Sequence, residues 1–198
     1  DIMQGGYLGS EYSNKEIKNF LDEKNIVYSK LSNTSLYKNV ASLINDGKVI
    51  GWFSGKMEFG PRALGNRSII GDPRDQNMQK KMNIKIKFRE SFRPFAPAIM
   101  EEKINEWFDI NSISPYMLLV AKIKSEKLIK LSKKNLLLQG LDKLNVKRSK
   151  VPAITHVDCS ARIQSVNKQN NKKFYELIKE FDKLTGCRIS LNTHHKPR

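Results

Sequence analysis

Residues 56–68 concentrate features that hold anions. Lys56, Arg62 and Arg67 supply three cationic groups, and a planar guanidinium matches phosphate or carboxylate oxygens two at a time. Two glycines let backbone N–H groups come close to a ligand, and a proline stiffens the turn. The apolar run at residues 49–53 is typical of a buried strand. We therefore expect an oxyanion-binding loop after a strand; the structural alternative is a solvated loop.

Other polar groups lie near the ends of predicted strands or in loops leading to them. They are Asn66 and Ser68; Lys87, Arg89 and Arg93; His156 and Arg162; and Ser190 and Asn192. Because α/β sheets place ligands at strand ends, we expect these side chains to converge on one polyanion, such as a triphosphate. For each cation the alternative is a surface salt bridge, and for His156 it is a structural role.

Few carboxylates accompany these cations. Glu58, Asp72, Glu90 and Asp158 could share Mg²⁺ with substrate phosphates. The sequence has no GxxxxGK[ST], GxGxxG, GxSxG or HExxH motif, and its two neighbouring histidines, 194 and 195, are not at metal-ligand spacing. No metal site built from protein side chains alone is expected.

Composition restricts the class of partner. The chain has 198 residues and a formal net charge of +16, which predicts an anionic partner or an acidic neighbour. The lysines are scattered, and interleaved exposed aromatic residues are not expected, so nucleic acid is disfavoured. No apolar run reaches the ~20 residues needed to cross a bilayer, and the first residues do not resemble a signal peptide. Two isolated cysteines, 159 and 187, fit a reducing compartment. We expect a cytoplasmic protein that does not enter a membrane.

Helical and strand patterns interleave along the chain. Helices are predicted at residues 14–23, 36–46 (capped by Ser35), 76–86, 101–108 and 172–185. Strands are predicted at 25–31, 49–53, 68–71, 117–123 (central in the sheet), 152–158 and 187–192, with extended chain at 92–100. Residues 83–89 also permit an extended reading, and residues 125–150 form a lysine-rich excursion. This order predicts an α/β fold with a mixed sheet and a long crossover.

Residues 51–69 resemble the signature of the C-terminal domain of NodU/CmcH-type O-carbamoyltransferases. Matching segments follow in order at residues 72–74, 87–97, 156–164 and 185–193, and residues 6–9 fit the start of that domain. The run at residues 58–68 is long enough to be highly specific. Cys159 departs from the family's usual glycine, and the chain after Thr193 departs from the family's usual continuation.

The resemblance implies a YrdC/Sua5-like fold, a mixed twisted β-sheet flanked by helices, as one domain over residues 1–198. It implies binding of ATP and carbamoyl phosphate, with Mg²⁺ assisting, and formation of carbamoyl-adenylate with release of pyrophosphate. An N-terminal Kae1-like domain, absent from this chain, would transfer the carbamoyl group to a hydroxyl of a sugar or natural product.

The resemblance also implies residue roles. The pairs at positions 87/89 and 190/192 resemble the KxR and SxN elements of the YrdC fold. Catalytic roles fall to Arg62, Arg67, Lys87 and Arg89, which would clamp the phosphates. Binding of nucleotide or phosphate falls to Lys56, Asn66, Ser68, Arg93, His156, Arg162, Ser190 and Asn192. The alternative function is a basic module that binds RNA or docks onto a partner without catalysis.

Overall fold

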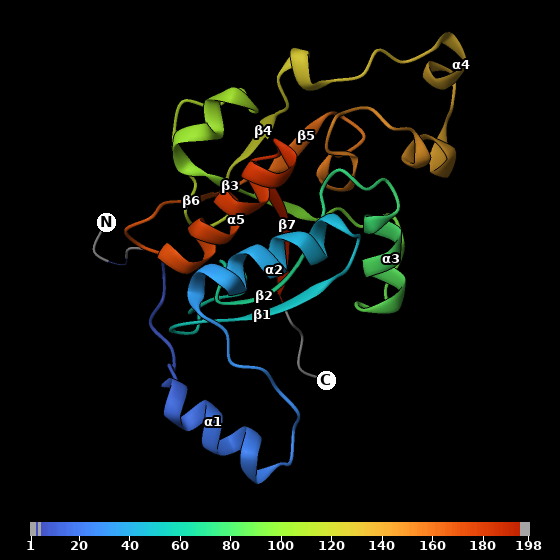
Figure 1. Ribbon diagram of the computed structural model, residues 1–198. Coiled ribbons are helices and arrows are strands. Elements are labelled where there is room, and N and C mark those ends of the chain that lie inside the picture. The colour runs from blue at the N-terminus through green and yellow to red at the C-terminus, as the bar shows by residue number, and fades with distance from the viewer. Residues whose placement is uncertain (1–2, 4, 195–198) are drawn as a thin grey trace.

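A five-stranded mixed sheet, in the order β1-β2-β7-β3-β6, forms the centre of the molecule (Figure 1). This computed structural model describes residue 3 and residues 5–194. The strands are β1 (Ile50–Phe53), β2 (Arg67–Gly71), β7 (Ile189–His194), β3 (Ala96–Met100) and β6 (Gln164–Val166). Neighbours are antiparallel except β3 and β6, which run parallel. A parallel pair requires a crossover, so the predicted α/β fold with a mixed sheet is confirmed.

Two helices, α2 (Asn33–Asn45) and α5 (Lys172–Thr185), pack against each other over one face of this sheet (Figure 1). The amide of Asn171 caps α5 by accepting the N–H of Phe174, and Gly186 ends the helix at φ 69°, as the sequence predicts. The second helix was expected to begin after Ser35. It begins earlier, because the Ser32 hydroxyl caps it by accepting the Ser35 N–H.

The core lies between the sheet and these two helices. Five of its side chains are fully buried: Ile70, Ile99 and Leu191 from the strands, and Phe174 and Ile178 from α5. Burial of one such side chain contributes about 1.5–3 kcal/mol. This packing fixes the sheet edge from which the polar loops emerge.

A second, two-stranded sheet joins β4 (Val120–Lys122) to β5 (Ser160–Arg162). The strand predicted at residues 117–123 was expected to be central, and this is wrong. β4 lies outside the five-stranded sheet, and in this segment Leu118 and Val120 are 66% and 62% exposed. An apolar run indicates a strand but does not say which neighbour it pairs with.

Two predicted strands are wrong for local reasons. Residues 152–158 begin with a 3₁₀ turn, η4 (Pro152–Ile154), which the Thr155 hydroxyl secures by donating to the Val151 carbonyl at 2.7 Å. Residues 25–31 form no strand in the described chain, and Val27 is 98% exposed. β-rich composition without a neighbouring strand is not enough to form a sheet.

The remaining elements are mostly short. They are α3 (Met78–Lys85), η1 (Glu101–Glu106), η2 (Ser125–Lys127), α4 (Lys133–Leu136) and η3 (Gly140–Asn145). The last three lie in the predicted lysine-rich excursion, which extends from the body (Figure 1). In the described part of the chain no helix is both long and apolar enough to cross a bilayer.

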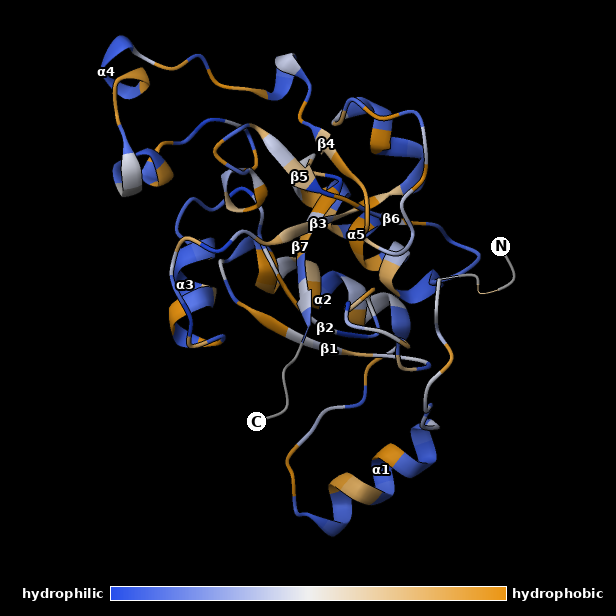
Figure 2. Cartoon of the chain, turned by 180° about the vertical axis from the view of Figure 1, so that it is seen from behind, coloured by the Kyte–Doolittle hydropathy of each residue, from blue (hydrophilic) through white to orange (hydrophobic). Residues whose placement is uncertain are grey.

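Helix α1 (Asn14–Glu23) stands apart from the body. Its predicted capping box is confirmed, since the Ser13 N–H donates to Glu16 at 2.7 Å and the Glu16 N–H donates to the Ser13 hydroxyl at 3.2 Å. No residue of α1 is buried, although Figure 2 shows apolar positions along it. Local capping therefore predicted this helix correctly, whereas its apolar spacing did not lead to packing against the core.

Candidate functional site

Most of the predicted polar segments meet at one edge of the five-stranded sheet. Phe53 at the end of β1 faces Arg67 at the start of β2, and Ala96 at the start of β3 faces Asn192 in β7. Residues 54–66 connect β1 to β2, residues 87–93 lead to β3, and β6 begins two residues after Arg162. The registers thus gather the loops that carry most of the predicted cations.

A buried carboxylate organises the loop between β1 and β2. Glu58 is 7% exposed, and its Oε1 accepts the N–H groups of Leu64 at 2.8 Å, Asn66 at 2.7 Å and Arg67 at 3.1 Å. Three charge-assisted hydrogen bonds to one atom hold the backbone in a single conformation. Glu58 was expected as a possible Mg²⁺ ligand, but the structure uses this oxygen inside the loop.

Arg67 also supports the loop. Its guanidinium donates to the carbonyls of Ser54 at 2.8 Å, Asn66 at 3.0 Å and Ser10 at 3.0 Å, and it lies 3.6 Å over the ring of Phe53. Burial lowers the pKa of Arg67. This side chain joins three backbone segments, and its predicted catalytic role stays a prediction.

Buried amides attach the same loop to the sheet. The Leu64 carbonyl accepts the Gln164 amide at 2.7 Å and the Tyr7 hydroxyl at 2.8 Å. The Asn192 amide nitrogen donates to the Ala63 carbonyl at 3.0 Å and to Gln164 Oε1 at 2.7 Å. Sequence reasoning did not select Gln164 or Tyr7 as site residues, because their contacts join segments distant in the sequence.

Gly65 is required by close packing. Its φ is +104°, and a Cβ at this position would lie 2.2 Å from a ring carbon of Phe174. Its N–H donates to the Ser68 hydroxyl at 3.1 Å. Ser68, predicted to bind phosphate, is 2% exposed and supports the loop from within.

Arg62 and Arg162 form the unneutralised part of the site. The Nε atom of each is buried without a hydrogen-bond partner, and within the described residues neither guanidinium pairs with a carboxylate. Arg162 Nη2 has one weak contact, 4.0 Å from the Met117 sulfur. Burial, and then the nearby charge of Arg62, lower the pKa of Arg162. Two cations are therefore held close together with no acid between them.

Asn192 contributes a third atom without a partner. Its Oδ1 is buried and accepts no hydrogen bond in the described chain, whereas its amide nitrogen already has two acceptors. Toward a ligand, Asn192 can therefore act only as an acceptor in this orientation.

A second group of cations precedes β3. Arg89 donates to the Asn83 side chain at 2.6 Å, and Arg93 pairs with Glu90 at 2.8 Å. Burial, and then the charge of Arg93, lower the pKa of Arg89. Lys87 donates to the carbonyl of the last residue of β7 at 2.5 Å. The two cation groups lie at the same edge of the sheet. The expectation that Arg62 and Arg89 line one cavity stays a prediction.

Lys56 and Asn66 line a cavity whose lining does not include Arg62 or Arg162. This cavity has a volume of about 260 Å³ and lies between the β1–β2 loop and the start of α5, where Lys172 and Lys173 also lie. The Asn66 amide donates to the Lys56 carbonyl at 2.7 Å. The two α5 lysines were not predicted as site residues, although the Asn171 cap marked where they would sit.

The His156 ring contacts a neighbouring carboxylate. Its Nδ1 is 3.1 Å from Asp158 Oδ1, just before β5, whereas Arg162 ends that strand. The Ser160 hydroxyl, at 2.6 Å, and Lys122 hold the pKa of Asp158 well below its usual range. Ser190 is 4% exposed, and its hydroxyl donates to a neighbouring carbonyl at 3.3 Å. The predicted binding roles of His156 and Ser190 stay predictions.

The carboxylates expected for Mg²⁺ are engaged elsewhere. Asp72 pairs with Arg74 at 2.6 Å, and Glu90 pairs with its arginine neighbour. Within the residues that the structure describes, no three metal-binding side chains come together. Binding of Mg²⁺ by one or two carboxylates together with substrate phosphates stays a prediction.

Exposed aromatic rings accompany the cations. Phe53, Phe59, Phe88 and Phe92 are 58%, 74%, 68% and 47% exposed. The expectation that exposed aromatic residues would not be interleaved with the cations is therefore wrong. Sequence alone did not reveal this, because these rings lie in loops whose burial depends on the tertiary fold.

An N-terminal arm completes the loop, and sequence reasoning did not anticipate its contacts. The Gly9 N–H donates to the Met57 carbonyl at 2.9 Å, and the Met57 N–H donates to the Ser10 carbonyl at 2.8 Å. The Phe59 N–H likewise donates to the Gly6 carbonyl at 2.7 Å. The arm therefore pairs with the β1–β2 loop although they are about fifty positions apart in the chain.

Comparison with known proteins gives consistent matches. Residues 41–197 match the family model described as carbamoyltransferase C-terminus. The chain is 48% identical to the uncharacterized protein sll1178 of Synechocystis, over 100% of the chain and 32% of that protein. It is 35% identical to nodulation protein NolO of Bradyrhizobium diazoefficiens, over 98% of the chain and 32% of that protein. It is also 35% identical to nodulation protein U of Sinorhizobium fredii, over 78% of the chain and 25% of that protein. The chain thus spans about a quarter to a third of the length of these relatives.

Proposed function

The chain belongs to the carbamoyltransferase C-terminus family, and on that premise we propose that it binds ATP and carbamoyl phosphate and forms carbamoyl-adenylate. The observation that carries this proposal is the Arg62–Arg162 pair, which has no neutralising acid in the described chain. An oxyanion between the two guanidiniums would relieve their repulsion. Each charge-assisted hydrogen bond would contribute about 1.5–3 kcal/mol.

Asn192 supports a carbamoyl group over a simple phosphate. A phosphate oxygen offers an acceptor, whereas the unpartnered Asn192 Oδ1 requires a donor. The amine of a carbamoyl group supplies such a donor beside its anionic oxygens. Because this oxygen is covered here, the ligand reaches it only when neighbouring side chains shift. In this proposal Asn192 contacts the carbamoyl NH₂ group, whereas the family resemblance implied that it binds nucleotide or phosphate.

The proposed reaction has two balanced parts. Water and carbamoyl phosphate yield carbamate and inorganic phosphate. A carbamate oxygen then bonds to the α-phosphorus of ATP as the bond to pyrophosphate breaks. Arg62, Lys87 and Arg89 would stabilise the charge on the phosphorus and on the leaving pyrophosphate. Arg67 and Glu58 would act indirectly, by holding the loop that presents Arg62.

Transfer of the carbamoyl group is proposed for the longer protein. The relatives are about three to four times the length that this chain covers. In this proposal a Kae1-like N-terminal domain accepts the carbamoyl-adenylate and passes the carbamoyl group to a hydroxyl of a sugar or natural product. Release of AMP would accompany that transfer.

Exchange of labelled pyrophosphate into ATP tests the adenylation step. We expect exchange that depends on carbamoyl phosphate and falls about 10²–10³-fold in Arg62→Ala and in Arg162→Ala. Lys38→Ala, which removes the same charge from an exposed position on α2, serves as the matched control and should exchange normally. Exchange that is independent of carbamoyl phosphate, or unchanged in Arg62→Ala, would refute the mechanism.

A second candidate function is favoured by the exposed phenylalanines beside the cations. Aromatic rings and arginines together suit stacking with single-stranded RNA. A basic RNA-binding module would show RNA affinity that falls steeply with salt, and no pyrophosphate exchange. Measuring both properties on one preparation separates the two functions.

A further inference from the structure

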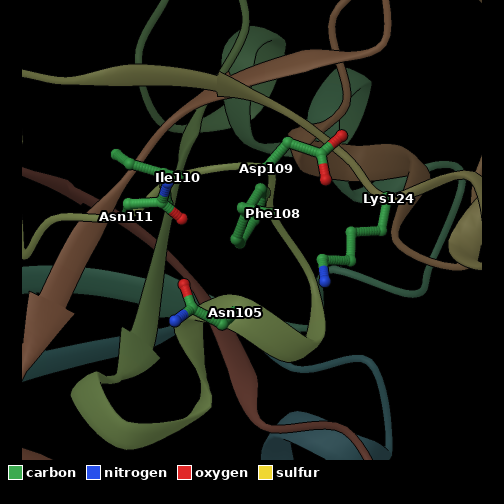
Figure 3. A pocket seen from close by; sticks show the side chains of 6 residues that line it. All are labelled: Asn105, Phe108, Asp109, Ile110, Asn111 and Lys124. Atoms are coloured by element: carbon green, nitrogen blue, oxygen red, sulfur yellow. The ribbon is translucent and has the colours of Figure 1, made fainter.

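A separate cavity of about 510 Å³ lies beyond the other end of β3. It is lined by Asn105, Phe108, Asp109, Ile110, Asn111 and Lys124 (Figure 3). β3 starts beside the arginine site, and η1 follows directly from its last residue. Five strand residues span about 17 Å, and none of the residues that line this cavity belongs to the proposed nucleotide site.

Asn105, Asp109 and Asn111 are exposed at this cavity and Lys124 is half-buried, so a ligand can reach their polar atoms from solvent. In the described chain, the side chains of Asn105, Asp109, Asn111 and Lys124 have no hydrogen bond or ion pair. Figure 3 shows the two amides on one side, the Lys124 ammonium on the other and Phe108 between them. Four such groups around one cavity can all be satisfied by a single ligand with several hydroxyls.

The backbone around the cavity is held by hydrogen bonds. The Asp109 N–H donates to the Lys122 carbonyl at 2.9 Å, and the Lys124 N–H donates to the Trp107 carbonyl at 2.9 Å. Phe108 and Ile123 form an antiparallel bridge between the same two segments. Because these pairs already fix the walls, a ligand need not organise them, and less ordering entropy is lost on binding.

The charges in this cavity balance, in a chain whose net charge is +16. The Asp109 carboxylate would repel an anionic ligand and the Lys124 ammonium would repel a cationic one. The two asparagine amides offer both hydrogen-bond donors and acceptors. Phe108 and Ile110 add apolar surface, which suits the C–H face of a sugar ring. The volume is within the usual range of about 300–1,000 Å³ for small-molecule sites. We propose that this cavity binds a neutral, polyhydroxylated ligand of monosaccharide or disaccharide size.

Saturation-transfer NMR on the 198-residue chain tests this site. Glucose and maltose are the neutral probes, and methyl phosphate and glycine, which carry observable C–H protons, represent an anion and a zwitterion. We expect binding of at least one sugar with a Kd of about 1 mM or tighter, and about fivefold to tenfold weaker binding in Asn105→Ala and Asp109→Asn. These side chains make no internal hydrogen bonds in the described chain, so both variants should fold. Asn19→Ala, at an exposed position on α1, is the matched control.

The outcomes separate this site from the proposed nucleotide function. Arg62→Ala should leave sugar binding unchanged, because the arginine pair lies at the other end of β3. If neither sugar binds, or if sugar binding is the same in Asn105→Ala and Asp109→Asn as in the parent chain, the inference is wrong. Binding of glycine or methyl phosphate at this cavity in place of the sugars would also overturn it.

Discussion

Removing the Glu58 carboxylate should destabilise the fold more than any comparable surface change. Glu58→Ala leaves the N–H groups of Leu64, Asn66 and Arg67 without the oxygen that now lies 2.7–3.1 Å from them. A buried donor left unsatisfied costs about 1–3 kcal/mol. Three donors therefore give about 3–9 kcal/mol as the full cost, and partial access of water reduces this. We expect the free energy of unfolding to fall by about 3–5 kcal/mol.

Two further variants sharpen the interpretation. Glu58→Gln keeps a neutral acceptor and should cost about half as much, because charge-assisted hydrogen bonds are roughly twice as strong as neutral ones. Glu23→Ala, which removes a carboxylate that is 70% exposed at the end of α1, should change stability by less than about 0.5 kcal/mol.

Urea unfolding followed by circular dichroism measures these differences. The three curves should share one slope, so that the midpoints report stability directly. A loss below about 1 kcal/mol in Glu58→Ala would refute the reasoning, because it would mean that the loop backbone finds other partners at little cost. An equal loss in Glu58→Gln and Glu58→Ala would show that the charge, and not the acceptor, is decisive.

Three other predictions concern Gly65, Arg62 and Asp158. Gly65→Ala should strongly lower the urea midpoint of unfolding, because the added Cβ would lie 2.2 Å from the Phe174 ring and the loop would have to move away from that ring. Unchanged urea unfolding would contradict this. Pyrophosphate should raise the melting temperature of the parent chain and raise it less in Arg62→Ala; equal shifts would exclude Arg62 from the anion site. Hydrogen bonds from Ser160 lower the pKa of Asp158 from 3.8, so its stabilisation is present above about pH 4 and is lost as pH falls further. Asp158→Asn should therefore lose less stability than the parent chain on acidification, and parallel pH profiles of thermal unfolding would oppose this.

Local signals in the sequence predicted much of the helical structure. The Ser13–Glu16 capping box and the Asn171 cap with Gly186 mark the ends of α1 and α5 correctly. Such caps act within one turn, so neighbouring residues suffice to define them. Strands were less predictable. The segments at 25–31 and 152–158 have strand-like composition but no sheet partner in the described chain, and strand formation depends on that partner.

For the site, the sequence by itself determined which residue types are available: arginines, glycines and a family signature around residues 58–68. Only the tertiary structure decided what each one does. Glu58 and Arg67 bond to the loop backbone, and Gln164 reaches the loop from a distant strand, whereas Arg62 and Arg162 are left unneutralised. The physical reason is that hydrogen-bond partners are assigned by three-dimensional proximity. A charged residue is free to meet a ligand only when the fold does not already satisfy it.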